Sequence, residues 1–256
     1  MSVSIEDALV HELRSAGCVF AEDEARLILA AASDRTNLVS MVQRRVSGVP
    51  LEHVLGWAEF CGLRIAVDAE VFVPRRRTEF LVDRAAASIR ESAVVVDLCC
   101  GSGAVGAALA ALIDSPELYA VDIDPAAVRC ARRNMPAERV FEGDLYDPLP
   151  ASLRGQVQVL VANAPYVPTE EIRLMPPEAR LHEPRVSLDG GADGLHIQRR
   201  VASGAQHWLA PGGHLLIETS ESQATRTVQA FTDAGLSARV ESSAELGATV
   251  VVGTRS

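Results

Sequence analysis

Strand-like and helix-like segments alternate between Val94 and Glu218, and this alternation limits the folds available to the chain. Short apolar runs typical of buried strands occur at residues 94–97, 118–121, 139–141, 157–162 and 214–218. Segments with helical spacing separate them, which predicts parallel strands joined by crossover helices. Two further strands near residues 237–241 and 248–254 indicate an antiparallel hairpin. We therefore expect an α/β protein with a doubly wound, mainly parallel sheet that the hairpin closes.

The first third of the chain is expected to lie outside this sheet. Apolar residues recur at helical spacing in three runs before residue 47, with Gly17 at the end of the first run. A helix from Glu79 to Glu91 is expected to lead into the sheet, and Gly62 suits the turn of a β-hairpin. We predict three parts: a small helical domain for substrate or partner recognition at 1–50, a β-hairpin linker at 51–76 and a catalytic domain at 77–256.

The composition argues against several classes of protein. An apolar share of 48% in 256 residues is enough for a folded core. A net charge of −10 disfavours non-specific binding to nucleic acid, because phosphates would be repelled. Five cysteines and six histidines fit no metal-ligand spacing, so we expect reduced thiols and no metal. No apolar run has membrane-spanning length and no leader pattern is present, so we expect a cytoplasmic protein without a membrane partner.

A glycine-rich turn follows the first strand of the expected sheet. Gly101 and Gly103 lack a Cβ, so the backbone there can approach a ligand closely. The Asp122 carboxylate can accept hydrogen bonds from ribose hydroxyls. With Gly106, these glycines also fit the Gly-x-Gly-x-x-Gly pattern of nicotinamide enzymes. Asp97 precedes them, and its carboxylate suits a cationic amino acid moiety better than a pyrophosphate. The turn therefore favours S-adenosylmethionine, which carries a sulfonium and an ammonium, over a nicotinamide cofactor.

A stiff tetrapeptide, Asn163-Ala164-Pro165-Tyr166, follows the strand at 157–162. Pro165 and Pro168 stop both helix and sheet pairing, so this loop lies at a strand's carboxyl end, where α/β sheets bind ligands. The Asn163 oxygen and a neighbouring carbonyl, expected to be that of Ala164, can accept both hydrogens of a planar NH2 group. Tyr166 offers a flat face for stacking. Taken alone, the tetrapeptide also fits an ordinary turn after a strand.

A series of motifs extends from about Arg44 to the carboxyl terminus. They are Arg44-Arg45-x-x-Gly48-x-Pro50-Leu51, Phe60-x-Gly62-Leu63, Pro74-Arg75-x-x-Thr78-Glu79, Asp97-Leu98-x-x-Gly101-Ser102-Gly103, Asn163-x-Pro165-Tyr166, Glu183-Pro184-x-x-x-Leu188-x-Gly190-Gly191-x-Asp193-Gly194-Leu195 and Leu209-x-Pro211-Gly212-Gly213. Together they resemble the glutamine amide N-methyltransferases that act on peptide-chain release factors, the HemK/PrmC family. The resemblance implies a seven-stranded class I S-adenosylmethionine-dependent methyltransferase fold with a small N-terminal helical domain.

The resemblance also implies the site residues and the activity. The expected cofactor site contains Asp97, Leu98, Cys99, Cys100, Gly101, Gly103, Asp122, Ile123, Asp144, Leu145 and Asn163. Asp144 is expected to accept a hydrogen bond from the adenine amino group, and Leu145 to pack on the ring. Asn163 and Tyr166 are the expected catalytic residues, and the substrate-binding residues are Asn163, Ala164, Pro165 and Tyr166. The implied reaction is N-methylation of a glutamine side-chain amide in a protein such as a release factor, with S-adenosylhomocysteine as the product.

Three departures from the family pattern keep other substrates open. Ala164 stands where proline is usual, Cys99 where the cofactor loop usually has its first glycine, and Arg76-Arg77 where Pro-Glu is common. A small-molecule N-methyltransferase acting on an amide or guanidino group is the main alternative. A DNA adenine methyltransferase is less favoured, since it would need a basic groove, and a non-catalytic cofactor-binding protein is a further alternative. The arginines at 75–77 form either a solvated patch or a contact for an acidic substrate group.

Overall fold

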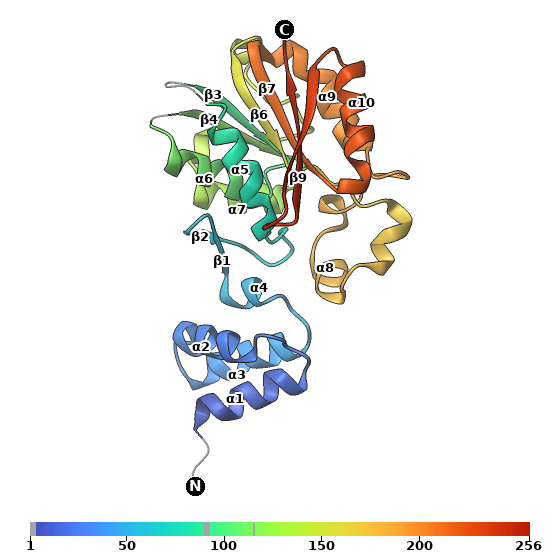
Figure 1. Ribbon diagram of the computed structural model, residues 1–256. Coiled ribbons are helices and arrows are strands. Elements are labelled where there is room, and N and C mark those ends of the chain that lie inside the picture. The colour runs from blue at the N-terminus through green and yellow to red at the C-terminus, as the bar shows by residue number, and fades with distance from the viewer. Residues whose placement is uncertain (1–3, 90–92, 115) are drawn as a thin grey trace.

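A seven-stranded sheet forms the centre of the protein (Figure 1). The computed structural model describes residues 4–89, 93–114 and 116–256. The strands lie in the order β5-β4-β3-β6-β7-β9-β8, and β9 is antiparallel to both of its neighbours while the other pairs are parallel. This arrangement confirms the predicted doubly wound sheet with a closing antiparallel hairpin. The strands are β3 (Val94–Leu98), β4 (Glu117–Asp122), β5 (Val140–Glu142), β6 (Val157–Ala162), β7 (Leu209–Thr219), β8 (Ser237–Ser243) and β9 (Ala248–Thr254).

Helices cover both faces of the sheet, because successive side chains of a strand point to opposite faces. In β6, Val159 and Val161 pack in one hydrophobic cluster, whereas Leu160 and Ala162 pack in the other. The first cluster is completed by α5 (Glu79–Ala86), α6 (Ala104–Leu112) and α7 (Pro125–Asn134), and the second by α9 (His196–Trp208) and α10 (Ala224–Asp233). Burial on both faces explains why the β6 sequence is nearly continuous apolar.

Within the described residues, four helices and a hairpin form the N-terminal part of the chain, before η1 (Arg76–Thr78) and α5 (Figure 1). The helices pack around a core of their own, in which Leu13 and Ile28 are fully buried. Val54 belongs to this core although it lies in the segment predicted as the hairpin linker, so the helical part extends to the end of α4. The elements are α1 (Ile5–Ser15), α2 (Ala21–Ala31), α3 (Arg35–Val46), α4 (Leu51–Leu55), β1 (Trp57–Phe60) and β2 (Leu63–Ala66). The domain limits at 50 and 76 remain a prediction.

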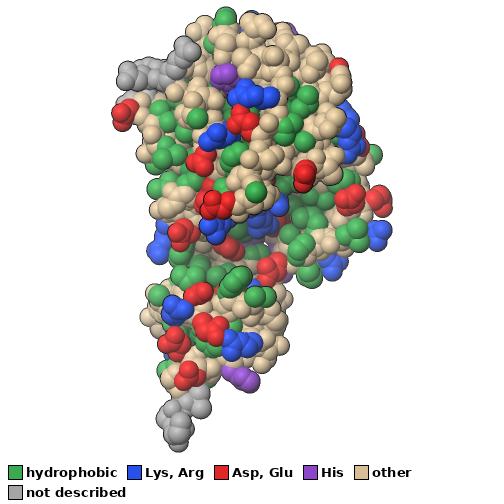
Figure 2. All heavy atoms as spheres, viewed as in Figure 1, with side chains coloured by type: hydrophobic (Ala, Val, Ile, Leu, Met, Phe, Trp, Pro, Cys, Tyr) green, Lys and Arg blue, Asp and Glu red, His purple; other side chains and the backbone are tan. Residues whose placement is uncertain are grey.

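Short helices fill the segment between β6 and α9. They are η4 (Thr169–Leu174), α8 (Pro177–His182) and η5 (Arg185–Ser187), and further single turns are η1 (Arg76–Thr78), η2 (Ala137–Arg139), η3 (Ala151–Leu153) and η6 (Glu221–Gln223). Figure 2 shows that the surface is hollowed between the N-terminal helices and the rest of the molecule. Arg45 of α3 connects the N-terminal helices to α8, because it donates to Glu24 of α2 and to Glu178 of α8, each at 2.6 Å.

Two predicted elements differ from the structure. Helix α5 ends at Ala86, earlier than the predicted end at Glu91, which lies outside the described residues. Strand β7 begins at Leu209 rather than at His214. Gly212 adopts a φ of 75° and the register against β6 shifts, so the motif residues Pro211, Gly212 and Gly213 form an irregularity within the strand. Within the described residues, no helix is both long enough and apolar enough to cross a membrane.

Candidate active site

One cavity lies at the carboxyl ends of the central strands, where the chain order reverses between β3 and β6. Leu98 pairs with Val121 of β4 and with Ala162 of β6, so the turns after these strands lie side by side. Most of the predicted site residues line the cavity: Asp97, Cys99, Cys100, Gly101, Asp122, Ile123, Asp144, Leu145, Asn163, Ala164, Pro165 and Tyr166. The expected cofactor residues and the expected acceptor residues therefore face the same space.

Leu98 and Gly103 were predicted in the site but do not line this cavity. The Leu98 side chain is fully buried in the core under α9 and α10, because residues next to each other in a strand face opposite sides. Gly103 has a φ of 76°, and a Cβ there would lie 3.1 Å from Ala131 and from Met135. Its lack of a side chain thus serves the packing of α6 against α7 rather than the approach of a ligand.

Asp122 holds the glycine turn in place. Its carboxylate accepts the backbone amide of Gly101 at 2.8 Å and that of Asp124 at 2.9 Å. Gly101 has a φ of 56°, and a Cβ there would meet open space, so the backbone at this position is accessible to a ligand. Cys99 has the same φ, which costs a residue with a Cβ on the order of 1 kcal/mol. Burial raises the pKa of the Cys99 thiol, so the side chain is a neutral thiol.

Asp97 is a buried carboxyl group at the inner wall of the cavity. Its side chain is 1% exposed, and Oδ2 accepts the Gly106 amide at 3.0 Å. No arginine or histidine in the described part of the chain lies within ion-pair distance of it. Burial raises the pKa of Asp97 to about 7, and the nearby Asp122 carboxylate acts in the same direction. A cation bound beside Asp97 would supply the charge that the protein does not.

Asp144 is already partnered within the chain. Its Oδ2 accepts a hydrogen bond from Arg200 Nη2 at 2.7 Å, and Arg200 itself lines the cavity. The role predicted for Asp144 toward an adenine amino group would therefore be shared with this ion pair. Leu145 has a φ of 51° and is buried, so its apolar side chain forms part of the same wall.

The acceptor loop, defined here as residues 163–166, enters the cavity from the end of β6. The Asn163 amide nitrogen donates weakly to Thr78 Oγ1 at 3.4 Å. The Oδ1 atom of the same amide therefore points away from Thr78. No donor within the described residues forms a hydrogen bond with that Oδ1. The Ala164 side chain is fully buried. The loop can thus offer a free oxygen to a donor group in the cavity.

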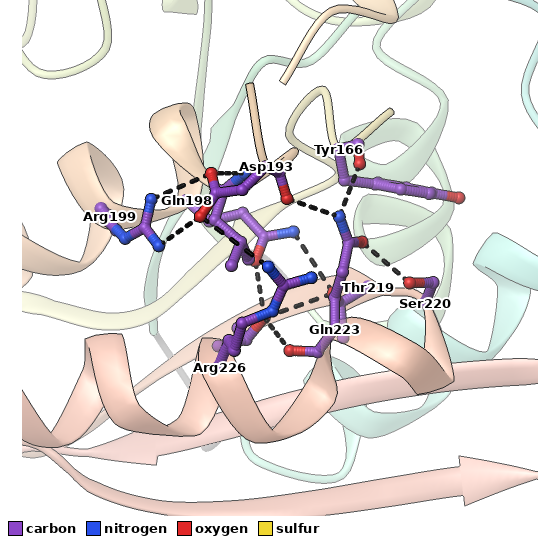
Figure 3. Close-up of polar contacts among 10 residues, drawn as sticks. Tyr166, Asp193, Gln198, Arg199, Thr219, Ser220, Gln223 and Arg226 are labelled. Carbon is purple, nitrogen blue, oxygen red and sulfur yellow. Dashed lines mark hydrogen bonds and ion pairs between the residues drawn. The ribbon is translucent and has the colours of Figure 1, made fainter. Parts of the chain in front are cut away.

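Gln223 connects this loop to the glycine-rich segment that precedes α9 (Figure 3). Its amide nitrogen donates to the carbonyl of Tyr166 at 2.9 Å and to that of Asp193 at 3.3 Å, and its oxygen accepts from Ser220 at 2.8 Å. Gly194 fits between these groups only because it lacks a Cβ, which would overlap the Tyr166 carbonyl. The motif around Gly194 therefore fixes the backbone of the acceptor loop.

Two of the three adjacent arginines are paired with buried carboxylates. Arg75 donates to Glu183 at 2.5 Å, and Arg77 Nε donates to Glu218 at 3.2 Å. Arg75 and Arg77 line the cavity, and Arg76 is exposed outside it. An acidic substrate group, one of the two alternatives that the sequence left open for the arginines, would therefore have to compete with Glu183 and Glu218 of the chain itself.

Sequence reasoning did not assign a role to several residues at this site. Thr78, Glu218 and Gln223 contact the acceptor loop from elements far away in the sequence, and Phe60 and Phe72 line the cavity from the hairpin region. Thr78 was noted only as part of a motif, and no periodic signal links any of these residues to Asn163. No group of three or more His, Cys, Asp or Glu side chains that could hold a metal occurs in the described part of the chain.

Comparisons with known proteins agree with this arrangement. The family profile described as methyltransferase small domain matches residues 66–183. The release factor glutamine methyltransferase of Geobacter sulfurreducens is 37% identical over 76% of this chain and 69% of its own length. The protein of the same name from Bradyrhizobium diazoefficiens is 35% identical over 91% of this chain and 88% of its own length.

Solved structures support the fold. A methyltransferase from Pyrococcus furiosus superposes with a TM-score of 0.57 at 15% identity and covers 83% of this chain and 96% of its own. The ribosomal protein L11 methylase from Lactobacillus delbrueckii subsp. bulgaricus gives a TM-score of 0.52 at 15% identity, over 75% of this chain and 84% of its own. At such identities the similarity concerns the fold alone.

Proposed function

The chain belongs to the family of release factor glutamine methyltransferases, and on this basis we propose that it transfers a methyl group from S-adenosylmethionine to the side-chain amide nitrogen of a glutamine in a peptide-chain release factor. The observation that carries the proposal is the position of Asn163. Asn163 directly follows β6, and it lines the same cavity as Asp97 and Asp122 of the strands β3 and β4.

The residues at the cofactor end of the cavity suit S-adenosylmethionine. Asp97 is buried without a cation from the described residues, so it would pair with the ammonium group of the cofactor. Asp122 keeps free lone pairs after it accepts two backbone amides, and these can accept ribose hydroxyls. Gly101 leaves room for close approach, and Ile123 and Leu145 offer apolar surface for the adenine.

The acceptor loop would prepare a poor nucleophile for reaction. An amide nitrogen is unreactive because its lone pair is delocalised into the carbonyl. The Asn163 oxygen and the backbone carbonyl of Ala164 would accept both N–H bonds, which turns the nitrogen lone pair toward the methyl donor. The same two acceptors stabilise the positive charge that grows on nitrogen in the transition state. No general base is required, since the methylated nitrogen is acidic and loses its proton afterwards.

Orientation supplies much of the remaining catalysis. When bound, the cofactor would supply a methyl group on a sulfonium, and the neutral thioether S-adenosylhomocysteine would be the leaving group. Holding the amide in line with that methyl group can contribute about 7–11 kcal/mol, because a bimolecular encounter becomes a unimolecular step. The rigidity of the acceptor loop serves this purpose: Pro165 restricts its backbone and Gln223 binds the Tyr166 carbonyl. Tyr166 would support the planar amide by stacking.

The partner and the cellular location are further parts of the proposal. The relatives are named for a peptide-chain release factor, and the helices α1–α4, which pack around a core of their own, would offer a separate surface for such a protein substrate. Recognition of that partner by the helices at 1–50 and a cytoplasmic location both remain predictions.

The proposal is tested by Asn163→Ala with a release factor as the acceptor. Methyl transfer from labelled S-adenosylmethionine should fall about 10²- to 10³-fold, as expected when one acceptor of the transition state is removed. The cofactor Kd, measured by calorimetry, should stay within about twofold, because Asn163 acts mainly on the acceptor. The control Gln229→Ala, which removes an exposed carboxamide from α10, should keep wild-type rates. Weaker cofactor binding with normal single-turnover rates would contradict the role given to Asn163.

A further inference from the structure

Tyr166, Arg77 and Glu218 form a closed set of hydrogen bonds beside the acceptor loop. Arg77 Nη2 donates to the Tyr166 hydroxyl at 2.6 Å, and Arg77 Nε donates to Glu218 Oε1 at 3.2 Å. The Tyr166 hydroxyl in turn donates to the same Glu218 oxygen at 3.3 Å. The Arg77 guanidinium also lies over the Tyr166 ring, 5.8 Å from its centroid. The three groups come from η1, the acceptor loop and β7, so only the tertiary structure brings them together.

The burial of these groups is unequal, and the difference explains how the set is held. The Glu218 side chain is 2% exposed, and its second oxygen, Oε2, is buried without a partner in the described structure. The Arg77 side chain is 46% exposed. A buried carboxylate needs a cation, and Arg77 supplies it to Glu218. If the guanidinium moved into solvent, the charge of Glu218 would be left uncompensated, so Glu218 holds Arg77 in place.

The hydroxyl of Tyr166 is consequently occupied in both of its roles. It accepts from Arg77 and donates to Glu218, and burial beside Glu218 raises the pKa of Tyr166, so the hydroxyl keeps its proton. Gln223 holds the backbone carbonyl of the same residue. The ring is therefore fixed at both ends, and the ring face that Arg77 does not cover, rather than the hydroxyl, is available to the cavity.

The same short turn contacts both functional side chains of the acceptor loop. Arg77 binds the Tyr166 hydroxyl, and Thr78, the next residue, accepts from the Asn163 amide nitrogen. Arg76 in the same turn is exposed, does not line the cavity and makes no hydrogen bond or ion pair with the described residues. The turn thus offers one arginine that engages the loop and a neighbour that does not.

We infer that Arg77, held by Glu218, is a positioning residue that fixes the Tyr166 ring as the platform on which the acceptor amide lies. This inference rests on the proposed function, because it assigns Tyr166 to the acceptor. In this role Arg77 touches neither the acceptor nor the cofactor, and it acts through the Tyr166 hydroxyl.

The inference is tested by a double-mutant cycle of Arg77→Met and Tyr166→Phe with a release factor as acceptor. Each single variant should lower kcat/KM for the acceptor about 10- to 100-fold, the range expected for loss of a charge-assisted hydrogen bond. If Arg77 acts through the hydroxyl, the double variant should be no slower than the slower single variant. The cofactor Kd should stay within about twofold in all three. Arg76→Met, which removes the same charge from the same turn, should keep wild-type rates.

Loss of Arg77 leaves Glu218 buried and uncompensated, so the cycle is also carried out on a Glu218→Gln background, where folding does not depend on the cation. Effects that multiply in the double variant, or wild-type kcat/KM in Arg77→Met, would overturn the inference. A second readout is independent of activity: with carbon-13-labelled tyrosine, the NMR signal that disappears in Tyr166→Phe should shift in Arg77→Met and not in Arg76→Met. If the wild type methylates no release factor, the proposed function fails, and an unshifted signal is then the result that refutes the positioning role.

Discussion

Replacing Asp97 by asparagine should make the protein more stable above neutral pH and weaken cofactor binding. The carboxyl group is 1% exposed and its pKa is raised by burial from 3.8 to about 7. Because the folded state binds this proton more tightly than the unfolded state, the stability that Asp97 contributes is complete below about pH 4. It is lost as pH rises through about 7, where a buried charge must form.

The size of the effect follows from the two pKa values. A difference between 3.8 and about 7, at about 1.4 kcal/mol per pH unit, corresponds to about 4 kcal/mol lost by the wild type between pH 4 and pH 8. The Asp97→Asn variant would avoid this loss, since a carboxamide is neutral at every pH and its oxygen can still accept the Gly106 amide. The bound cofactor would oppose the loss in the wild type, because its ammonium favours the ionised form of Asp97.

Urea unfolding of the wild type and Asp97→Asn at several pH values provides the measurement. The two proteins should have similar unfolding free energies near pH 4, and the variant should be more stable by up to about 4 kcal/mol at pH 8. By calorimetry at pH 8, the variant should bind S-adenosylmethionine about 10- to 100-fold more weakly. Asp233→Asn, an exposed carboxylate on α10, is the control and should follow the wild type. A variant that is less stable than the wild type at pH 8, or that binds the cofactor equally well, would refute this reasoning.

Further predictions concern the loop strain, the contact between α3 and α8, and the support of the acceptor loop. Cys99→Gly should change the unfolding free energy by less than about 1 kcal/mol, because the relief of backbone strain at the positive φ offsets the lost side-chain packing. A larger decrease in the unfolding free energy, measured by urea denaturation, would argue against strain at this position. Arg45→Met should destabilise by about 3–5 kcal/mol in urea, since a buried carboxylate loses its cation, whereas Arg26→Ala in an exposed pair should cost under about 1 kcal/mol; equal costs would contradict this. Gln223→Leu should destabilise by about 1–3 kcal/mol and lower methyl transfer, because two part-buried carbonyls lose their donor. A wild-type rate would show that the loop needs no such support, and Gln229→Ala is the control.

The acceptor loop illustrates how much of the site the sequence predicted. The apolar run of β6 and the two prolines after it were sufficient to place Asn163 at a strand's carboxyl end. The glycine turn after β3 was predicted from similar local signals, and pairing of adjacent parallel strands brings the two turns together. Leu98 was assigned to the cofactor site with its neighbours, yet the alternation of the strand directs it into the core.

The sequence by itself determined the order of strands and helices, the two turns and the family, because each depends on residues close together in the chain. Only the tertiary structure decided how those turns are held. Arg77 lies 141 residues from Glu218, and Arg75 lies 108 residues from Glu183, and neither separation follows a period of a helix or strand. Such pairs form because a buried charge requires a partner wherever the fold brings one, and that requirement leaves no pattern in the linear sequence.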